Sequence, residues 1–207
     1  MPLSLHSLPL FPLGTVLFPG GLLPLRIFEV RYLDMIGRCQ RANAPFGVVS
    51  LTQGHEVRQP GAPAESFAEV GTLARITELS TPQPGLMLLR AEGLHRFRIT
   101  ARSQLKHGLW VADVESIADD LPVPVPPDLQ TSAQALSRLL HSLQDKEPQQ
   151  VPPIATPWHL DDCGWVANRW CELLPVPQPL KQRLMALDNP LLRLELVSDV
   201  LAKMGIA

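Results

Sequence analysis

Residues 121–127 read LPVPVPP, and this stretch separates two parts of the chain that have different hydrophobic periods. A run this rich in proline favours an extended polyproline conformation, and neither a helix nor a central strand can contain it. We therefore predict a β-rich part over residues 1–120, a proline-rich linker over residues 121–130 and a helical part over residues 131–207. The expected fold class is α+β.

The part before the linker has short apolar runs separated by turn residues, which is typical of β-strands. One amphipathic stretch, residues 29–42, has Tyr32, Ile36 and Cys39 at helical spacing and predicts a single helix. We expect Glu92-Gly93 to interrupt a strand, and residues 53–67 to form a mobile surface loop. The runs expected to form strands are residues 8–13, 15–17, 22–28, 46–51, 70–79, 86–90, 94–100 and 110–114.

Helical periodicity begins after the linker. Leu136, Leu139, Leu140 and Leu143 follow an i, i+3, i+4, i+7 spacing, which predicts one apolar helix face. Asp161 or Asp162 can cap the next helix, and Asn189-Pro190 is a start signal for the last one. That last helix is apolar on most sides, which indicates contact with more than one partner. We therefore expect a homodimer that forms through this helix or through a β edge.

Composition limits the kind of partner that the chain can have. Charged residues make up 18% of it and the net charge is −2, so nothing attracts it globally to nucleic acid or to an anionic membrane. Residues 8–25 carry no charge, but prolines interrupt them and no membrane span or signal peptide is expected. Cys39, Cys163 and Cys171 lack the spacing of a disulfide framework, which predicts reduced thiols and a cytoplasmic protein.

Several segments, taken in order, resemble the N-terminal, substrate-binding domain of Lon proteases. Each motif is short, and the specificity comes from their order and spacing over nearly the whole chain. Arg26 and Val30 depart from the family's pattern, in which a histidine and a proline are expected. The segments that carry the resemblance are 8–13 (LPLFPL), 17–20 (LFPG), 23–32 (LPLRIFEVRY), 46–49 (FGVV), 70–76 (VGTLARI), 92–97 (EGLHRF), 181–184 (KQRL) and 188–195 (DNPLLRLE).

The resemblance implies a PUA-like β-barrel or folded sheet with one helix, followed by a helical bundle. It also implies a role, because in full-length Lon this domain helps to capture unfolded polypeptide and to assemble the oligomer. We therefore expect a free-standing module that binds unfolded or client polypeptide. The residues expected to bind it, from their family position and from apolar groups close to charges, are Phe11, Phe18, Arg26, Phe28, Glu29, Arg31 and Tyr32.

The catalytic machinery of Lon is not expected in this sequence. A Walker A loop needs Gly-Lys-Ser/Thr to hold phosphates, and none of the four lysines follows a glycine. No Gly-x-Ser-x-Gly nucleophile elbow occurs either, and the Ser–Lys peptidase of the family belongs to a later domain. The prediction is a non-catalytic binding or adaptor module, without a cofactor or a bound metal.

Three other functions have weaker support in the sequence. PUA-like folds can bind RNA through a basic stripe, but few aromatic residues interleave with the basic cluster here, and a solvated strand face is favoured. Zinc binding by His159, Cys163 and Cys171 lacks the usual paired spacing, so buried thiols are favoured. An enzyme would need convergent titratable groups, and none is evident. The basic cluster consists of Arg90, His95, Arg96, Arg98, Arg102, Lys106 and His107.

Overall fold

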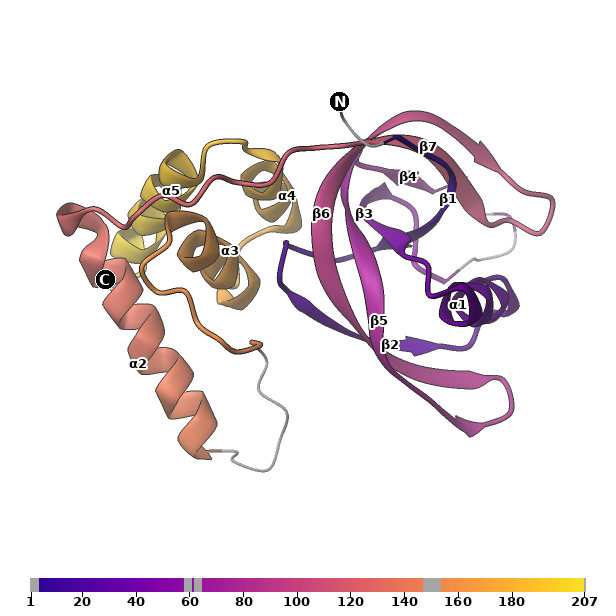
Figure 1. The fold of residues 1–207 in the computed structure, drawn as a ribbon, viewed down its shortest axis with the longest axis horizontal. Helices are drawn as coiled ribbons and strands as arrows, with labels where there is room; N and C mark the ends of the chain where they lie inside the picture. The colour runs from indigo at the N-terminus through magenta and orange to yellow at the C-terminus, as the bar shows by residue number, and fades with distance from the viewer. Residues whose placement is uncertain (1–3, 58–60, 62–64, 147–153, 207) are drawn as a thin grey trace. The chain divides into compact units, whose positions relative to one another are not determined.

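The computed structural model describes residues 4–57, 61, 65–146 and 154–206 (Figure 1). The chain divides into two compact units, Met1–Asp119 and Asp120–Ala207. The first unit holds the strands and one helix, and the second holds the other α-helices of the described residues. The predicted α+β class is therefore confirmed.

The strands of the first unit form a sheet that closes on itself. Antiparallel pairing joins β1 to β7, β7 to β6, β6 to β5 and β5 to β3, and β1 then pairs with β3 in parallel. Strand β2 lies off this circuit and pairs with β6. The bounds are β1 Ser4–Leu13, β2 Leu22–Ile27, α1 Val30–Ala42, β3 Phe46–Gln53, β4 Ser66–Phe67, β5 Val70–Gln83, β6 Leu86–Gln104 and β7 Trp110–Ser116.

Two apolar clusters hold this unit together, one on each face of β1. Side chains alternate along a strand, so Phe11 and Leu13 enter the cluster under α1 while Leu8 and Leu10 enter the other. Helix α1 contributes Tyr32, Met35, Ile36 and Cys39 to the first cluster, which confirms the helical face expected from the sequence. The helix thus packs on the sheet next to β1, as Figure 1 shows.

Two local predictions were wrong, and a third was wrong in part. The loop expected over residues 53–67 ends in strand β4, which pairs with β3 and buries Phe67. The other two predictions concern residues 15–17 and Gly93. Residues 15–17 form no strand; the Leu17 carbonyl accepts a hydrogen bond from the Thr72 hydroxyl, at 2.6 Å, instead of pairing with a strand. Strand β6 runs through Gly93 without a break, but its ladder with β5 shifts register between Gly93 and Arg96, as the expected break of the ladder requires. The Gly93 N–H donates to the Gly21 carbonyl and the Gly93 carbonyl accepts from the Gly20 N–H, each at 2.8 Å. Gly93 therefore permits a close backbone approach within a continuous strand.

Substitution of Gly93 by alanine should destabilise the first unit. A Cβ atom there would lie 2.3 Å from the backbone oxygen of Phe18, which cannot move aside cheaply. We expect the free energy of unfolding, measured by denaturant titration, to fall by about 1–3 kcal/mol. Gly37→Ala in α1 is the control, because its nearest new contact is the flexible end of Arg41 at 3.4 Å. That variant should be neutral or slightly more stable, and equal effects at the two sites would contradict the close approach.

The second unit consists of helices whose starts were visible in the sequence. Asp162 caps α3 by accepting a hydrogen bond from the Trp165 N–H at 2.7 Å, and Asn189 caps α5 by accepting one from Leu192 N–H at 3.1 Å. Leu136 and Leu140 of α2 are buried, as the leucine spacing predicted. The bounds are η1 Pro127–Leu129, α2 Gln130–Lys146, α3 Cys163–Leu173, α4 Gln178–Ala186 and α5 Pro190–Lys203.

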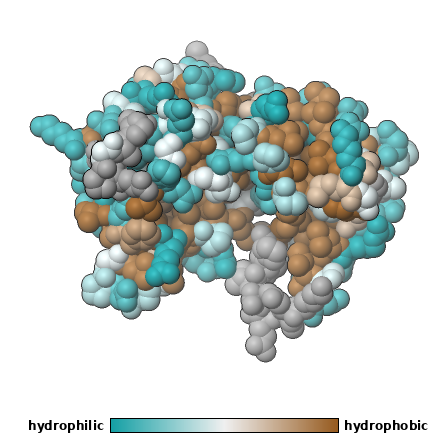
Figure 2. Space-filling view, turned by 180° about the vertical axis from the view of Figure 1, so that it is seen from behind, coloured by the Kyte–Doolittle hydropathy of each residue, from teal (hydrophilic) through white to brown (hydrophobic). Residues whose placement is uncertain are grey.

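Both units expose some apolar surface, which is visible from behind in Figure 2. In the parts of the chain that the structure describes, no helix is long and apolar enough to cross a membrane. The large apolar side chains that are exposed are Phe28, Val30, Val57, Leu88 and Leu105 in the first unit, and Leu121, Leu192, Leu196, Met204 and Ile206 in the second. Phe28 and Val57 come together at one site.

Candidate functional site

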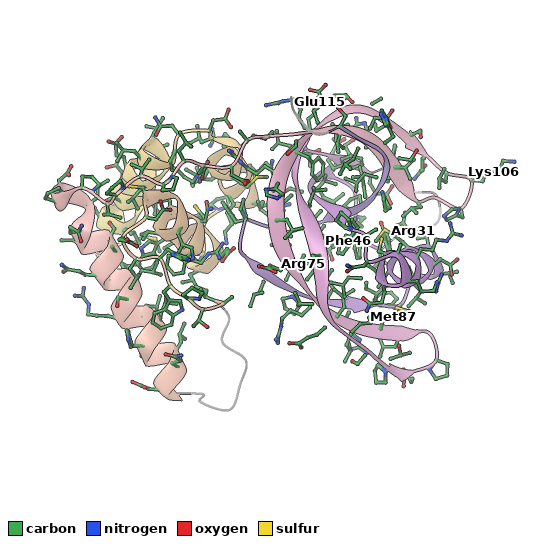
Figure 3. All side chains as sticks on the ribbon, viewed as in Figure 1. Arg31, Phe46, Arg75, Met87, Lys106 and Glu115 are labelled. Carbon is green, nitrogen blue, oxygen red and sulfur yellow. The ribbon has the colours of Figure 1, made fainter. Side chains whose placement is uncertain are left out.

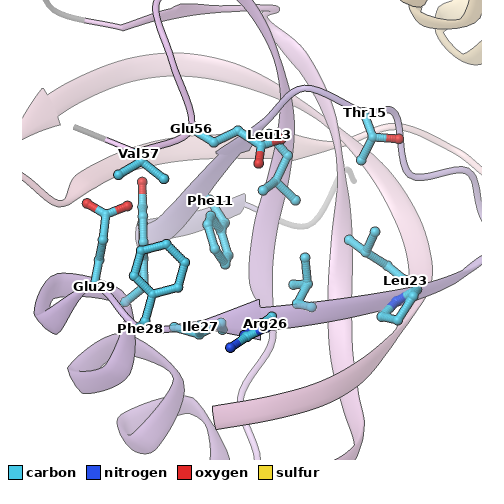
Figure 4. Close-up of a pocket in the computed structure, with 13 residues that line it drawn as sticks. Phe11, Leu13, Thr15, Leu23, Arg26, Ile27, Phe28, Glu29, Glu56 and Val57 are labelled. Atoms are coloured by element: carbon cyan, nitrogen blue, oxygen red, sulfur yellow. The ribbon is translucent and has the colours of Figure 1, made fainter. Parts of the chain in front are cut away.

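An open pocket with a volume of about 330 Å³ lies beside β2 in the first unit (Figure 4). Strand β2 forms one wall, and the end of β1 with Thr15 faces it. Glu56 and Val57, which follow β3, complete the opening. Most of the lining is apolar, and charged groups are few. The lining residues are Phe11, Leu13, Thr15, Leu23, Pro24, Leu25, Arg26, Ile27, Phe28, Glu29, Tyr32, Glu56 and Val57.

A stack of aromatic rings forms the buried side of the pocket. The rings of Phe11 and Tyr32 lie 4.1 Å apart between centroids with an angle of 24° between their planes, and the guanidinium of Arg31 lies 4.5 Å from the Tyr32 ring centre. Burial raises the pKa of Tyr32 well above its usual range, so its hydroxyl stays protonated at neutral pH. The stack offers a rigid apolar surface and no acid or base for chemistry.

Arg31 fixes the start of α1 next to this stack. It is buried, and its guanidinium donates to Glu29 and to Glu65, each at 3.2 Å, and to the Gly108 carbonyl at 2.9 Å. Burial alone would raise the pKa of Glu65, but hydrogen bonds from its own backbone and from Trp110, together with Arg31, hold that pKa below its usual range. Arg31 thus joins α1, the segment before β4 and the β6–β7 turn.

Five of the seven residues expected to bind polypeptide line the pocket, and two do not. Phe18 is fully buried, and Arg31 is turned toward Glu65 and Gly108 (Figure 3 labels Arg31). No pattern in the sequence indicated Glu56 and Val57, which lie in the loop expected over residues 53–67. Residues 58–60 and 62–64 of that loop are outside the described residues. The five lining residues are Phe11, Arg26, Phe28, Glu29 and Tyr32.

Apolar side chains at the opening of the pocket remain accessible to a ligand. Phe28 is 52% exposed and Val57 is 46% exposed, while Phe11 and Tyr32 beside them are buried. Large apolar side chains that gather in the open mark a binding surface more often than single exposed ones do. The pocket therefore combines a preformed apolar interior with aromatic and aliphatic surface at its edge.

The basic cluster over residues 90–107 does not form a continuous stripe. Arg96 is buried and donates to the Ala118 carbonyl at 3.4 Å. Arg90 pairs with Glu78 at 2.9 Å, and Arg102 lies over the Phe67 ring at 4.9 Å. His95 contacts Asp119 at 2.8 Å. Arg98, Lys106 and His107 are exposed, and Figure 3 shows Lys106 at the tip of the β6–β7 turn. Few of these cations are thus left to follow a nucleic-acid backbone.

The cysteines expected to be buried thiols are buried and free in all three cases. Burial raises the pKa of Cys171 to about 12, which keeps this thiol protonated at neutral pH. Within the described ranges, no three His, Cys, Asp or Glu side chains are grouped so that they could hold a metal ion. His159, Cys163 and Cys171 are therefore not brought together.

A closed sheet with one helix, an apolar pocket beside its off-circuit strand and a following helical unit define an α+β protein with an open surface site. The family model described as the ATP-dependent protease La (LON) substrate-binding domain matches residues 7–203. This chain belongs to that family. The match extends through both units, from β1 to the end of α5.

Known relatives agree with this assignment. The chain is 30% identical to the Lon protease of Anaeromyxobacter dehalogenans over 200 residues, which are 94% of this chain and 23% of the relative. It is 31% identical to protein cereblon of Danio rerio over 155 residues, 72% of this chain and 34% of that protein. The chain thus spans about a quarter to a third of the length of these relatives.

Two solved structures share the fold. A Lon N-terminal domain protein from Xanthomonas campestris has a TM-score of 0.72 at 32% identity, with 94% of this chain and 98% of that chain covered. The N-terminal domain of the Mycobacterium avium complex Lon protease has a TM-score of 0.59 at 17% identity, with 93% and 96% covered. The second likeness shows the fold alone.

Proposed function

We propose that this chain is a non-catalytic module that binds unfolded or client polypeptide in the pocket beside β2. The observation that carries the proposal is the open pocket of about 330 Å³ with aromatic and leucine side chains inside and both Arg26 and Glu29 in its lining. An unfolded chain exposes apolar side chains, and burying them contributes about 25 cal/mol per Å². The family's description as a substrate-binding domain supports the same role.

The polar groups of the pocket support holding a ligand rather than converting it. The Glu56 carboxylate accepts a hydrogen bond from the Gly14 N–H at 2.5 Å, and the Glu29 carboxylate accepts one from Arg31 at 3.2 Å. Both carboxylates are therefore held in place by hydrogen bonds within the protein. Among the described lining residues, Thr15 supplies the one aliphatic hydroxyl, and no histidine, lysine or cysteine lies beside it to activate it.

Phe28→Ala should weaken polypeptide binding by about tenfold or more. Truncation of a large, exposed aromatic ring at an interface removes one of the side-chain types that dominate binding energy. The measurement is fluorescence anisotropy of a labelled, permanently unfolded and apolar-rich polypeptide titrated with the protein. Leu105→Ala is the control, because Leu105 is 40% exposed but lies in the β6–β7 turn, outside the lining.

Two results would count against this function. The first is the absence of binding by the wild-type protein at high micromolar concentration. The second is an equal loss in Phe28→Ala and Leu105→Ala, which would mean that exposed apolar groups act without regard to the pocket. A loss confined to Phe28→Ala supports the pocket as the binding site.

Two further properties complete the proposal. A cytoplasmic location is supported by three cysteines that are all free and buried. Self-association through α5 is supported by Leu192 and Leu196, each 40% exposed and one helical turn apart. The pocket belongs to the first unit and α5 to the second, so self-association does not need the pocket.

A further inference from the structure

Strand β2 has one edge that faces away from β6. The two strands pair in antiparallel register from Leu22 opposite Glu92 to Ile27 opposite Met87. The hydrogen bond from the Gly93 N–H to the Gly21 carbonyl sets the phase of this ladder. Because bonded and non-bonded positions alternate in an antiparallel pair, Leu22, Pro24 and Arg26 direct their backbone groups away from β6. Pro24 suits this position, since it has no N–H to offer.

The pocket runs along this outward edge of β2. Residues from Leu23 to Ile27 all line it, although successive side chains point to opposite faces of the strand. Side chains from both faces of β2 can line one pocket when that pocket follows an edge of the strand. No β6 residue contributes to the lining, so the edge is the one that faces away from β6. Among the strands that the structure describes, none pairs with this edge. Of the outward backbone groups, those of lining residues are the N–H of Arg26 and the carbonyls of Pro24 and Arg26, and Leu22 continues the same edge beyond the lining.

The charges around the edge favour a ligand with basic groups. Among the residues that the structure describes, the lining has two carboxylates, Glu29 and Glu56, against one guanidinium, Arg26. Arg31 forms an ion pair with Glu29 and also one with Glu65. Counting Arg31 and Glu65 with the lining gives three carboxylates and two guanidinium groups. The excess of negative charge attracts Lys and Arg on a ligand and repels Asp and Glu.

We infer that the pocket binds its client in an extended conformation, as a strand added to the outward edge of β2, and prefers apolar segments flanked by Lys or Arg. This inference rests on the proposed polypeptide-binding function and specifies its mode. Backbone hydrogen bonds to Leu22, Pro24 and Arg26 would provide sequence-independent affinity. Alternate side chains of the client would then reach Phe11 and Phe28, which explains how one site accepts many sequences.

The first test uses backbone N-methylation of a peptide and leaves the protein unchanged. The probe is a ten-residue peptide that alternates leucine and threonine between two lysine pairs. Two derivatives carry N-methyl groups on alternate residues, one on the leucines and the other on the threonines. Only one set of amides can face β2, so one derivative should lose at least tenfold in affinity while the other stays within about threefold of the parent.

The second test removes one backbone donor from the protein. Arg26→Pro deletes the outward N–H of Arg26 and leaves the β6 ladder intact, as the proline at position 24 already does. Arg26→Ala is the matched control, because it removes the same side chain and keeps the N–H. We expect Arg26→Pro to bind the parent peptide about three- to tenfold more weakly than Arg26→Ala. Circular dichroism of both variants verifies that the sheet is retained.

The outcomes separate the binding mode from the function itself. Equal affinities of the two methylated peptides would overturn strand addition and leave polypeptide binding in place. Absence of any binding, of this peptide or of an unfolded polypeptide, would remove the proposed function as well.

A peptide with glutamate pairs that binds as tightly as the lysine form would overturn the charge preference. If Arg26→Pro alters the oligomeric state measured by sedimentation but not the peptide affinity, the outward edge of β2 binds a second copy of the chain. That result would overturn the inference.

Discussion

Arg193→Met is expected to lower the free energy of unfolding of the second unit by about 3–5 kcal/mol. Arg193 lies in α5, and its side chain is 1% exposed. Its guanidinium donates to Asp120 at 2.5 Å, to Asn168 at 3.0 Å and to the Leu184 carbonyl at 2.9 Å, and also to the Leu187 carbonyl. Methionine can fill much of the volume but donates to none of these acceptors. The cost arises because a carboxylate and two backbone carbonyls then lose a charged donor in the interior.

The measurement is a denaturant titration followed by the helical signal in circular dichroism. Arg138→Met is the matched control, because Arg138 is exposed in α2 of the same unit, and it should change stability by no more than about 0.5 kcal/mol. The loss of stability in Arg193→Lys should lie between the losses in Arg193→Met and Arg138→Met, since one ammonium group cannot reach partners on several sides. A loss below about 1 kcal/mol in Arg193→Met would show that the network contributes little.

Arg31→Met is expected to destabilise the first unit by about 3 kcal/mol, because it breaks a buried ion pair by removing one partner. The side chains of Arg31 and Glu65 are 5% and 10% exposed, so little water is available to replace the guanidinium. The variant also removes the donor to the Gly108 carbonyl and the cation above the Tyr32 ring. Slower hydrogen exchange in α1 and β6 of the wild type than of the variant would report this loss.

The effect of Arg31→Met should depend on pH through Glu65. Because the folded-state pKa of Glu65 lies below its usual value, this group stabilises the fold above its unfolded-state pKa, and the contribution disappears as the pH falls through the folded-state value. The difference between wild type and variant should therefore be largest above about pH 5 and shrink in acid. Arg38→Met on the exposed side of α1 is the control and should show neither effect. A difference that stays constant from neutral pH to acid would rule out Glu65 as the cause.

Local interactions made much of the fold predictable from the sequence. Helix α1 follows from the spacing of Tyr32, Ile36 and Cys39, and the caps at Asp162 and Asn189 need only a side chain and an N–H a few residues away. The prolines of residues 121–126 keep this segment out of a helix or a central strand by their own geometry, and Pro127 stands at the start of η1, where a proline is tolerated. Each of these features depends on residues that are close together in the sequence, so each can be predicted from the sequence alone.

The pairing of distant segments was decided by the tertiary structure. In the sequence, Gly93 is typical of a strand break, but in the structure it forms backbone hydrogen bonds with Gly20 and Gly21. Arg96 is typical of a surface cation in the sequence, but its side chain is buried in the structure. Strand β2 meets β6, and Glu56 and Val57 join the pocket, through contacts between residues far apart along the chain. Such contacts depend on which apolar faces pack together. The sequence alone therefore indicated the family and the three aromatic residues of the pocket lining, whereas the open edge of β2 and the shape of the pocket exist only in the folded chain.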